Sequence, residues 1–83
     1  MTLEEQLAEY DRLAALSYER ALQESVEERK AIIAEGRRRL MAGEPLYGDE
    51  GWHWTPAKLK REKRQEKADD VVYGVFLLRQ LGL

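Results

Sequence analysis

Apolar residues recur at helical spacing through the first half of the chain. Leu3, Leu7 and Tyr10 follow one another at steps of four and three residues, and the stripe continues beyond them. Such spacing is typical of a helix with one apolar face. Thr2 is followed three residues later by Glu5, which is the pattern of an N-terminal capping box. These features predict a helix over residues 2–42.

The apolar stripe shifts by one residue part-way along this predicted helix. It resumes at Leu22 and Val26, in a register that no longer matches its beginning. Either the stripe rotates around one helix or the helix breaks. Ser25 begins a second capping-box pattern, which favours a break. The residues beside it include no Gly, Pro, Asn or Asp, which turns between helices normally contain. We therefore favour one continuous helix over two shorter ones.

A second helix is predicted by its start signals. Gly43, with a Pro two residues later, is expected to end the first helix. Residues 43–55 then form a loop rich in aromatic residues. Thr55 is a good N-cap, and Pro56 occupies the first helical position, where Pro is favoured. The second helix is expected over residues 56–81.

The segment from Val71 to Leu78 is apolar at seven of its eight positions. Its length and its β-branched residues also suit a buried strand. No other strand is predicted to pair with it, so we favour a helix. The predicted fold is therefore all-α, a single domain over residues 1–83 built as a long antiparallel hairpin of two helices.

A helix that is apolar nearly all round is normally buried on several sides. One partner helix covers only one of them, and a chain of 83 residues offers little else. Gly74 would allow close approach of another helix. Self-association into a helical bundle is the simplest way to bury the segment. The predicted oligomer interface consists of Val71, Val72, Val75, Phe76, Leu78 and Leu81.

Composition narrows the classes of site. The chain has no Cys and a single His, so we expect no disulfide, no metal site and no cofactor. Absence of Cys fits a reducing compartment. The N-terminus is acidic without a long apolar core, and no apolar run approaches the length of a membrane span. We expect a soluble, cytoplasmic protein with no membrane partner.

Charge is unevenly distributed, although the 14 basic and 16 acidic residues give a net charge of only −2. Acids dominate residues 1–35 and bases dominate residues 36–67. A hairpin would bring Arg37–Arg39 beside the run Lys58–Lys67 and create a basic pole. A solvated helix face is the favoured interpretation of this run, and contact with phosphates is the alternative. The candidate binding residues here are Arg37, Arg38, Lys60, Arg61 and Arg64.

The aromatic loop holds the most distinctive string of the chain, Trp52-His53-Trp54. Trp is enriched where proteins bind partners, so these residues are a candidate partner or ligand site. The interpretation we favour is a structural lid over the end of the hairpin, with the binding site as its alternative. No Ser, Cys or carboxylate stands at a spacing that would make His53 part of a catalytic triad. Asp69 and Asp70 are expected to pair with Arg or Lys of a neighbouring helix.

No catalytic motif stands out, so we expect a protein that is not an enzyme. The favoured hypothesis is a small helical interaction module, an adaptor or inhibitor that acts as a homo-oligomer on an unknown protein partner. The first alternative is nucleic-acid binding through the basic pole. The second alternative is binding of a small anionic or nucleotide ligand by the Trp residues and nearby Arg residues.

Overall fold

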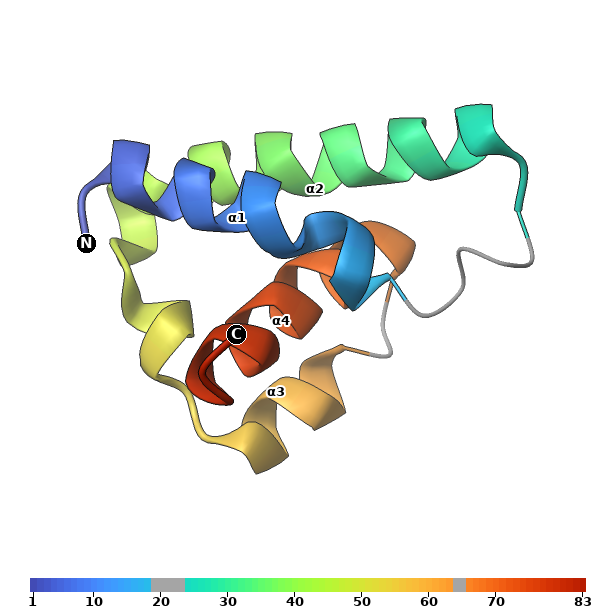
Figure 1. Ribbon diagram of the computed structural model, residues 1–83. Coiled ribbons are helices and arrows are strands. Elements are labelled where there is room, and N and C mark those ends of the chain that lie inside the picture. The colour runs from blue at the N-terminus through green and yellow to red at the C-terminus, as the bar shows by residue number, and fades with distance from the viewer. Residues whose placement is uncertain (19–23, 64–65) are drawn as a thin grey trace.

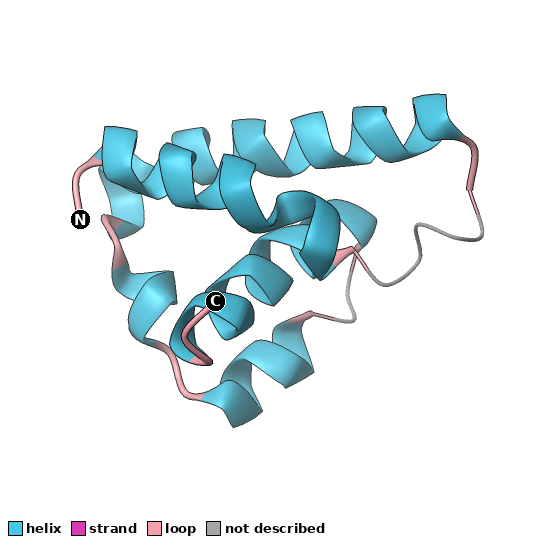
Figure 2. Cartoon of the chain, viewed as in Figure 1, coloured by secondary structure: helices cyan, strands magenta, loops and turns pink. Residues whose placement is uncertain are grey.

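The computed structural model describes residues 1–18, 24–63 and 66–83. All regular structure within these ranges is helical, without a strand (Figures 1 and 2), which confirms the all-α prediction. The elements are α1 (Leu3–Ser17), α2 (Val26–Tyr47), the short 3-10 helix η2 (Glu50–His53), α3 (Pro56–Glu62) and α4 (Lys67–Gln80).

The other helices pack around α4. In the view of Figure 1, α1 and α2 lie above α4, α3 lies below it, and η2 lies near its C-terminal end. Val71 and Val75 of α4 are fully buried. The surrounding helices contribute buried apolar side chains to the same cluster, among them Tyr10, Leu13, Leu40 and Leu59. The core is therefore organised around the last of the four α-helices described.

Two of the predicted helix starts are confirmed in detail. The Thr2 hydroxyl accepts a hydrogen bond from the Glu5 backbone N–H, and the Glu5 carboxylate accepts one from the Thr2 N–H. At α3, the Thr55 hydroxyl accepts from the Lys58 N–H, and Pro56 takes the first helical position. Each cap satisfies backbone donors that a helix start leaves without partners.

The prediction of one continuous helix over residues 2–42 is wrong. α1 ends at Ser17, Tyr18 has an extended backbone, and Ser25 caps α2 by accepting a hydrogen bond from the Glu28 N–H. Residues 19–23, where the stripe shifts, lie outside the described residues. A continuous helix would be about 60 Å long, whereas the longest extent of the fold is 32 Å. The shift of the apolar stripe fits two separate helices, α1 and α2, that each bury one apolar face in the same core.

The prediction that Gly43 and Pro45 end the first helix is also wrong. α2 continues through Pro45 to Tyr47, and Gly48 closes it by donating its N–H to the Glu44 carbonyl at 2.8 Å. Gly48 has a φ of 59°, a conformation that favours glycine. Pro45 stands in the last turn, where the hydrogen bond that it removes and the crowding by its ring affect only the end of the helix. The predicted loop 43–55 is correspondingly shorter and includes η2.

The predicted helix over residues 56–81 is two helices. Glu66 has an extended backbone before α4, and residues 64–65 lie outside the described residues. The interruption lets α3 fold back along α4, where Leu59 becomes fully buried. The buried Lys63 side chain then lies 2.8 Å from the Asp70 carboxylate. The fold is therefore not the long two-helix hairpin that the pattern predicted.

The reason given for self-association is wrong as well. Val71, Val72, Val75 and Phe76 are buried by other helices of the same chain, with at most 6% of each residue exposed. Leu78 is half-buried against this core and Leu81 is exposed. A second copy is therefore not needed to cover α4, and self-association stays a prediction without this support.

Gly74 marks a close approach, as predicted. A Cβ at this position would lie 2.9 Å from Cβ of Ser17 and 3.1 Å from Cε of Lys63. The Ser17 hydroxyl also lies 2.9 Å from the Val71 carbonyl oxygen. Absence of a side chain at Gly74 therefore lets the end of α1 and the Lys63 stem pack directly on the α4 backbone.

Candidate binding pocket

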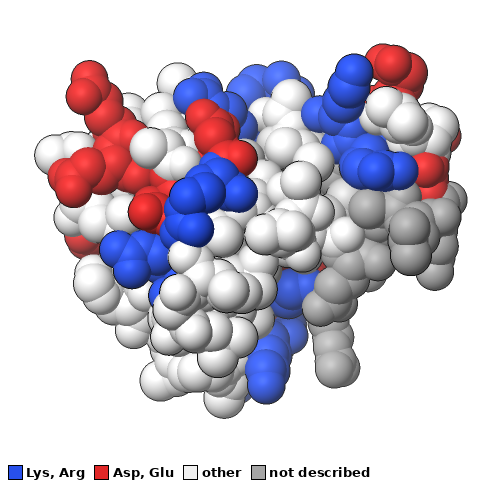
Figure 3. Space-filling view, viewed as in Figure 1, with Lys and Arg blue, Asp and Glu red and all other residues white. Residues whose placement is uncertain are grey.

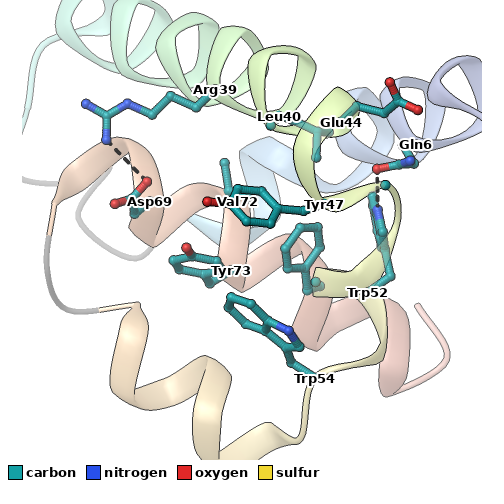
Figure 4. A pocket seen from close by; sticks show the side chains of 14 residues that line it. Gln6, Arg39, Leu40, Glu44, Tyr47, Trp52, Trp54, Asp69, Val72 and Tyr73 are labelled. Carbon is teal, nitrogen blue, oxygen red and sulfur yellow. Dashed lines mark hydrogen bonds and ion pairs between the residues drawn. The ribbon is translucent and has the colours of Figure 1, made fainter.

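A pocket of about 340 Å³ opens between the end of α2, η2 and α4. This volume falls within the range of ligand sites in proteins, about 300–1,000 Å³. Figure 4 shows rings from three segments facing it. Tyr47 comes from the last turn of α2, Trp52 and Trp54 from η2 and its C-cap, and Tyr73 and Phe76 from α4.

The rings pack on one another in a fixed arrangement. The Trp54 and Tyr73 rings stack with centroids 5.6 Å apart, and the Trp52 and Phe76 rings are tilted with centroids 4.6 Å apart. Both distances are typical of favourable aromatic pairs. Tyr47 is different, because 65% of it is exposed. Four rings therefore form a preformed wall, and Tyr47 forms an accessible edge.

Among the described residues, the charged groups that line the pocket are one cation, Arg39, and two carboxylates, Glu44 and Asp69. The Arg39 guanidinium is already engaged, since it donates hydrogen bonds to Glu66, to Asp69 and to Glu35. Glu44 makes no ion pair with any described residue. The described part of the pocket lining therefore carries a net negative charge.

The environment of Tyr73 reflects this charge. Burial, and then the negative charges of Asp69 and Glu62, raise the pKa of its phenol above the ordinary value. A phenol with a raised pKa stays neutral at physiological pH. Tyr73 therefore presents a neutral ring to the pocket, with carboxylates nearby.

Two indole N–H groups of the site differ in their hydrogen bonding. The Trp52 Nε1–H donates to the Oε1 oxygen of buried Gln6 at 3.0 Å. The Trp54 Nε1–H is buried and has no acceptor among the described residues. An unsatisfied buried donor costs free energy, whereas a satisfied one holds its ring in place. The hydrogen bond to Gln6 therefore fixes the Trp52 indole in the fold, whereas the Trp54 indole has no such bond.

This difference yields a direct prediction. Trp52→Phe leaves the Gln6 oxygen without its donor, whereas Trp54→Phe removes a donor that has no acceptor. Both variants lose the same side-chain volume. We expect Trp52→Phe to lower the free energy of unfolding by about 1–3 kcal/mol more than Trp54→Phe does. Urea denaturation followed by circular dichroism measures both. Equal losses would contradict the assigned roles.

The predicted binding residues are only partly brought together. Trp52 and Trp54 line the pocket, but His53 does not, and its exposed ring lies 3.6 Å from the Asp49 carboxylate. Arg37 pairs with Asp11 of α1 and Arg38 pairs with Glu35. Lys60 and Arg61 are exposed on α3, and Arg64 lies outside the described residues. Neither Arg37, Arg38, Lys60 nor Arg61 lines the pocket.

The predicted basic pole is also largely neutralised. Arg37, Arg38 and Arg39 all pair with carboxylates, and the Lys63 ammonium pairs with Asp70 inside the fold. Figure 3 shows basic side chains scattered over the face that it draws rather than gathered in one patch. Asp69 and Asp70 pair with Arg39 and Lys63 of neighbouring helices, as predicted.

Sequence reasoning missed Tyr47, Tyr73 and Glu44 as parts of the site. Its hairpin placed Tyr47 in a loop, while the structure places it four residues after Gly43 on α2. This spacing puts both on one helix face, and Gly43 leaves room for the pocket beside the Tyr47 ring. The pairing of a small residue with an aromatic residue at this spacing was the available signal.

Other classes of site find little support in the described residues. No group of three or more His, Asp or Glu in that part of the chain is placed to hold a metal ion. None of the described helices is long and apolar enough to cross a membrane. Comparison with protein-family models, with curated proteins and with solved structures finds no match for this chain. The chemistry of the pocket is therefore the basis for assigning a function.

Proposed function

We propose that this protein is a small interaction module, not an enzyme, that binds a partner protein through the aromatic pocket. The observation that carries the proposal is the combination of a preformed wall of four rings with the exposed edge at Tyr47. Aromatic residues with accessible apolar surface are the commonest anchors of protein interfaces.

The surface beside the pocket favours a protein partner over a small ligand. Leu46, the neighbour of Tyr47 in the last turn of α2, is 77% exposed. Met41, five residues before Leu46 on the same helix, is 42% exposed. A small molecule would occupy the pocket without needing this apolar surface, whereas a partner segment lying across α2 would cover it. The occupant is thus a side chain of the partner, flanked by apolar contacts.

The pocket geometry weighs against the two alternatives. An anionic or nucleotide ligand would meet Glu44 and Asp69 in the lining. Arg39, the one cation that the described residues place there, is already paired. Nucleic acid would require a basic surface, and the three consecutive arginines of α2 are engaged with carboxylates. A partner side chain would pack on the aromatic wall without requiring a free cation, which both an anionic ligand and nucleic acid would need.

A pocket-filling variant tests the proposal. A Cβ at Gly43 would lie 3.6 Å from Cδ2 of Tyr47, an ordinary contact. Gly43→Leu would therefore keep the helix, with a gain in propensity of about 0.5–1 kcal/mol, and fill the pocket. Peptides are selected from a random display library on the wild-type protein, and their affinity for Gly43→Leu is then measured. We expect this affinity to be at least about tenfold lower, since loss of a central anchor contact costs over about 1 kcal/mol.

Ala31→Leu is the matched control, because Ala31 is exposed near the start of α2 and does not line the pocket. Selected peptides that bind Gly43→Leu as well as the wild type would place the binding surface elsewhere. Salt-dependent binding of oligonucleotides that is weakened by Lys60→Ala and Arg61→Ala would support the nucleic-acid alternative instead.

A further inference from the structure

The aromatic pocket combines π faces with carboxylates. Five rings line it, and the charged groups that the described residues add to the lining are two carboxylates and one cation that is already paired. In the view of Figure 4, Asp69 lies on one side of the Tyr47 ring and Glu44 on the other. The faces of aromatic rings attract cations because their quadrupole is negative there. The rings and the carboxylates therefore both favour a positively charged occupant of the pocket.

The chain itself shows that one of these rings attracts an ammonium group. The Lys58 Nζ lies 3.9 Å from the centroid of the Trp54 ring. Lys58 does not line the pocket, so this contact lies outside it. The distance is well within the range of cation–π attraction, about 6 Å. The pocket offers other aromatic rings beside two carboxylates, and no Lys lines it in the part of the chain that the structure describes.

We infer that the side chain this pocket takes from its partner is a lysine, whose four-carbon stem packs against the exposed Tyr47 ring and whose ammonium group is attracted by the carboxylates of Asp69 and Glu44. This inference rests on the proposed function and specifies the chemistry of the anchor. Lys suits the site because its stem is apolar and its charge is compact. A basic partner also complements the net charge of −2 on this protein.

The probe for the experiment is n-butylammonium, which reproduces the lysine side chain, and its neutral counterpart is 1-butanol. Each is titrated to about 100 mM at constant ionic strength, because probes of this size bind weakly. The readout is the pair of indole N–H signals of Trp52 and Trp54 in ¹H–¹⁵N NMR spectra. We expect butylammonium to bind about 5–30-fold more tightly than butanol.

Three variants assign the preference to the site. Asp69→Asn removes one lining carboxylate, and Glu44→Gln removes the other without releasing a paired cation. We expect each to reduce the preference for butylammonium at least about threefold, since a carboxylate near a bound ammonium contributes on the order of 1 kcal/mol. Glu27→Gln makes the same charge change at an exposed site at the other end of α2 and should have no effect.

The outcomes separate the inference from the proposed function. Butanol binding as tightly as butylammonium, with both lost in Gly43→Leu, would overturn the lysine assignment and leave the pocket as a binding site. A preference that survives both Asp69→Asn and Glu44→Gln would also overturn it. If neither probe shifts the indole signals of the wild-type protein, the pocket is not a binding site, and both the inference and the proposed function fail.

Discussion

Replacing Lys63 by methionine is expected to lower the free energy of unfolding by about 3–5 kcal/mol. The Lys63 and Asp70 side chains are only 10% and 7% exposed, and their charged atoms lie 2.8 Å apart. Methionine fills a similar volume but leaves the buried Asp70 carboxylate without this cation. A buried charge that loses its partner is among the most destabilising changes a single substitution makes. Urea denaturation followed by circular dichroism measures the loss.

Two further variants test this explanation. Lys60→Met changes an exposed lysine of the same helix and should shift the free energy of unfolding by less than about 0.5 kcal/mol. The double variant Lys63→Met/Asp70→Leu removes both charges and should recover most of the loss, because an apolar pair replaces a buried ion pair at little cost. A loss below about 1 kcal/mol for Lys63→Met would mean that water solvates the Asp70 carboxylate.

Phe76→Ala is expected to cost about 3–5 kcal/mol in unfolding free energy. Phe76 is 4% exposed, its ring packs against Trp52 and Tyr73, and it also lines the pocket. Truncation removes these contacts and leaves a cavity that the stacked rings cannot readily fill. The measurement is urea denaturation at several protein concentrations.

The concentration series distinguishes the core of one chain from an interface between copies. If Phe76 belongs to the core of a single chain, the urea concentration at the unfolding midpoint does not depend on protein concentration. We expect this for both the wild type and Phe76→Ala. Leu81→Ala is the control, because Leu81 is 76% exposed and should change stability by less than about 0.5 kcal/mol. A midpoint that rises with protein concentration would restore the hypothesis of self-association.

Local signals predicted local structure well. The caps at Thr2 and Thr55 were recognisable because a cap is complete within four residues. The nearly all-round apolar character of α4 correctly indicated burial on several sides. The error lay in what buries it, because a two-helix hairpin has too few elements to surround α4. Two interruptions, after Ser17 and before Glu66, supply the additional helices.

Those interruptions are decided by packing that a local window does not contain. Ser25 carried a correct cap signal, but it was outweighed by the absence of the usual turn residues. Pro45 carried a stop signal that α2 overrides in its last turn. The pocket was harder still to predict from the sequence, because its rings come from α2, η2 and α4. No spacing along the chain reveals that Tyr47 and Tyr73 face one space.

The central position of α4 also determines when the chain can fold. The helix that the other described helices surround is the last of them to leave the ribosome. Before it emerges, buried residues of the earlier helices, such as Leu13, Leu40 and Leu59, have no α4 surface to cover them. The contact between Ser17 and Val71 joins positions 54 residues apart. Such distant pairings slow folding, so the nascent chain stays open to chaperones and proteases until synthesis has passed α4.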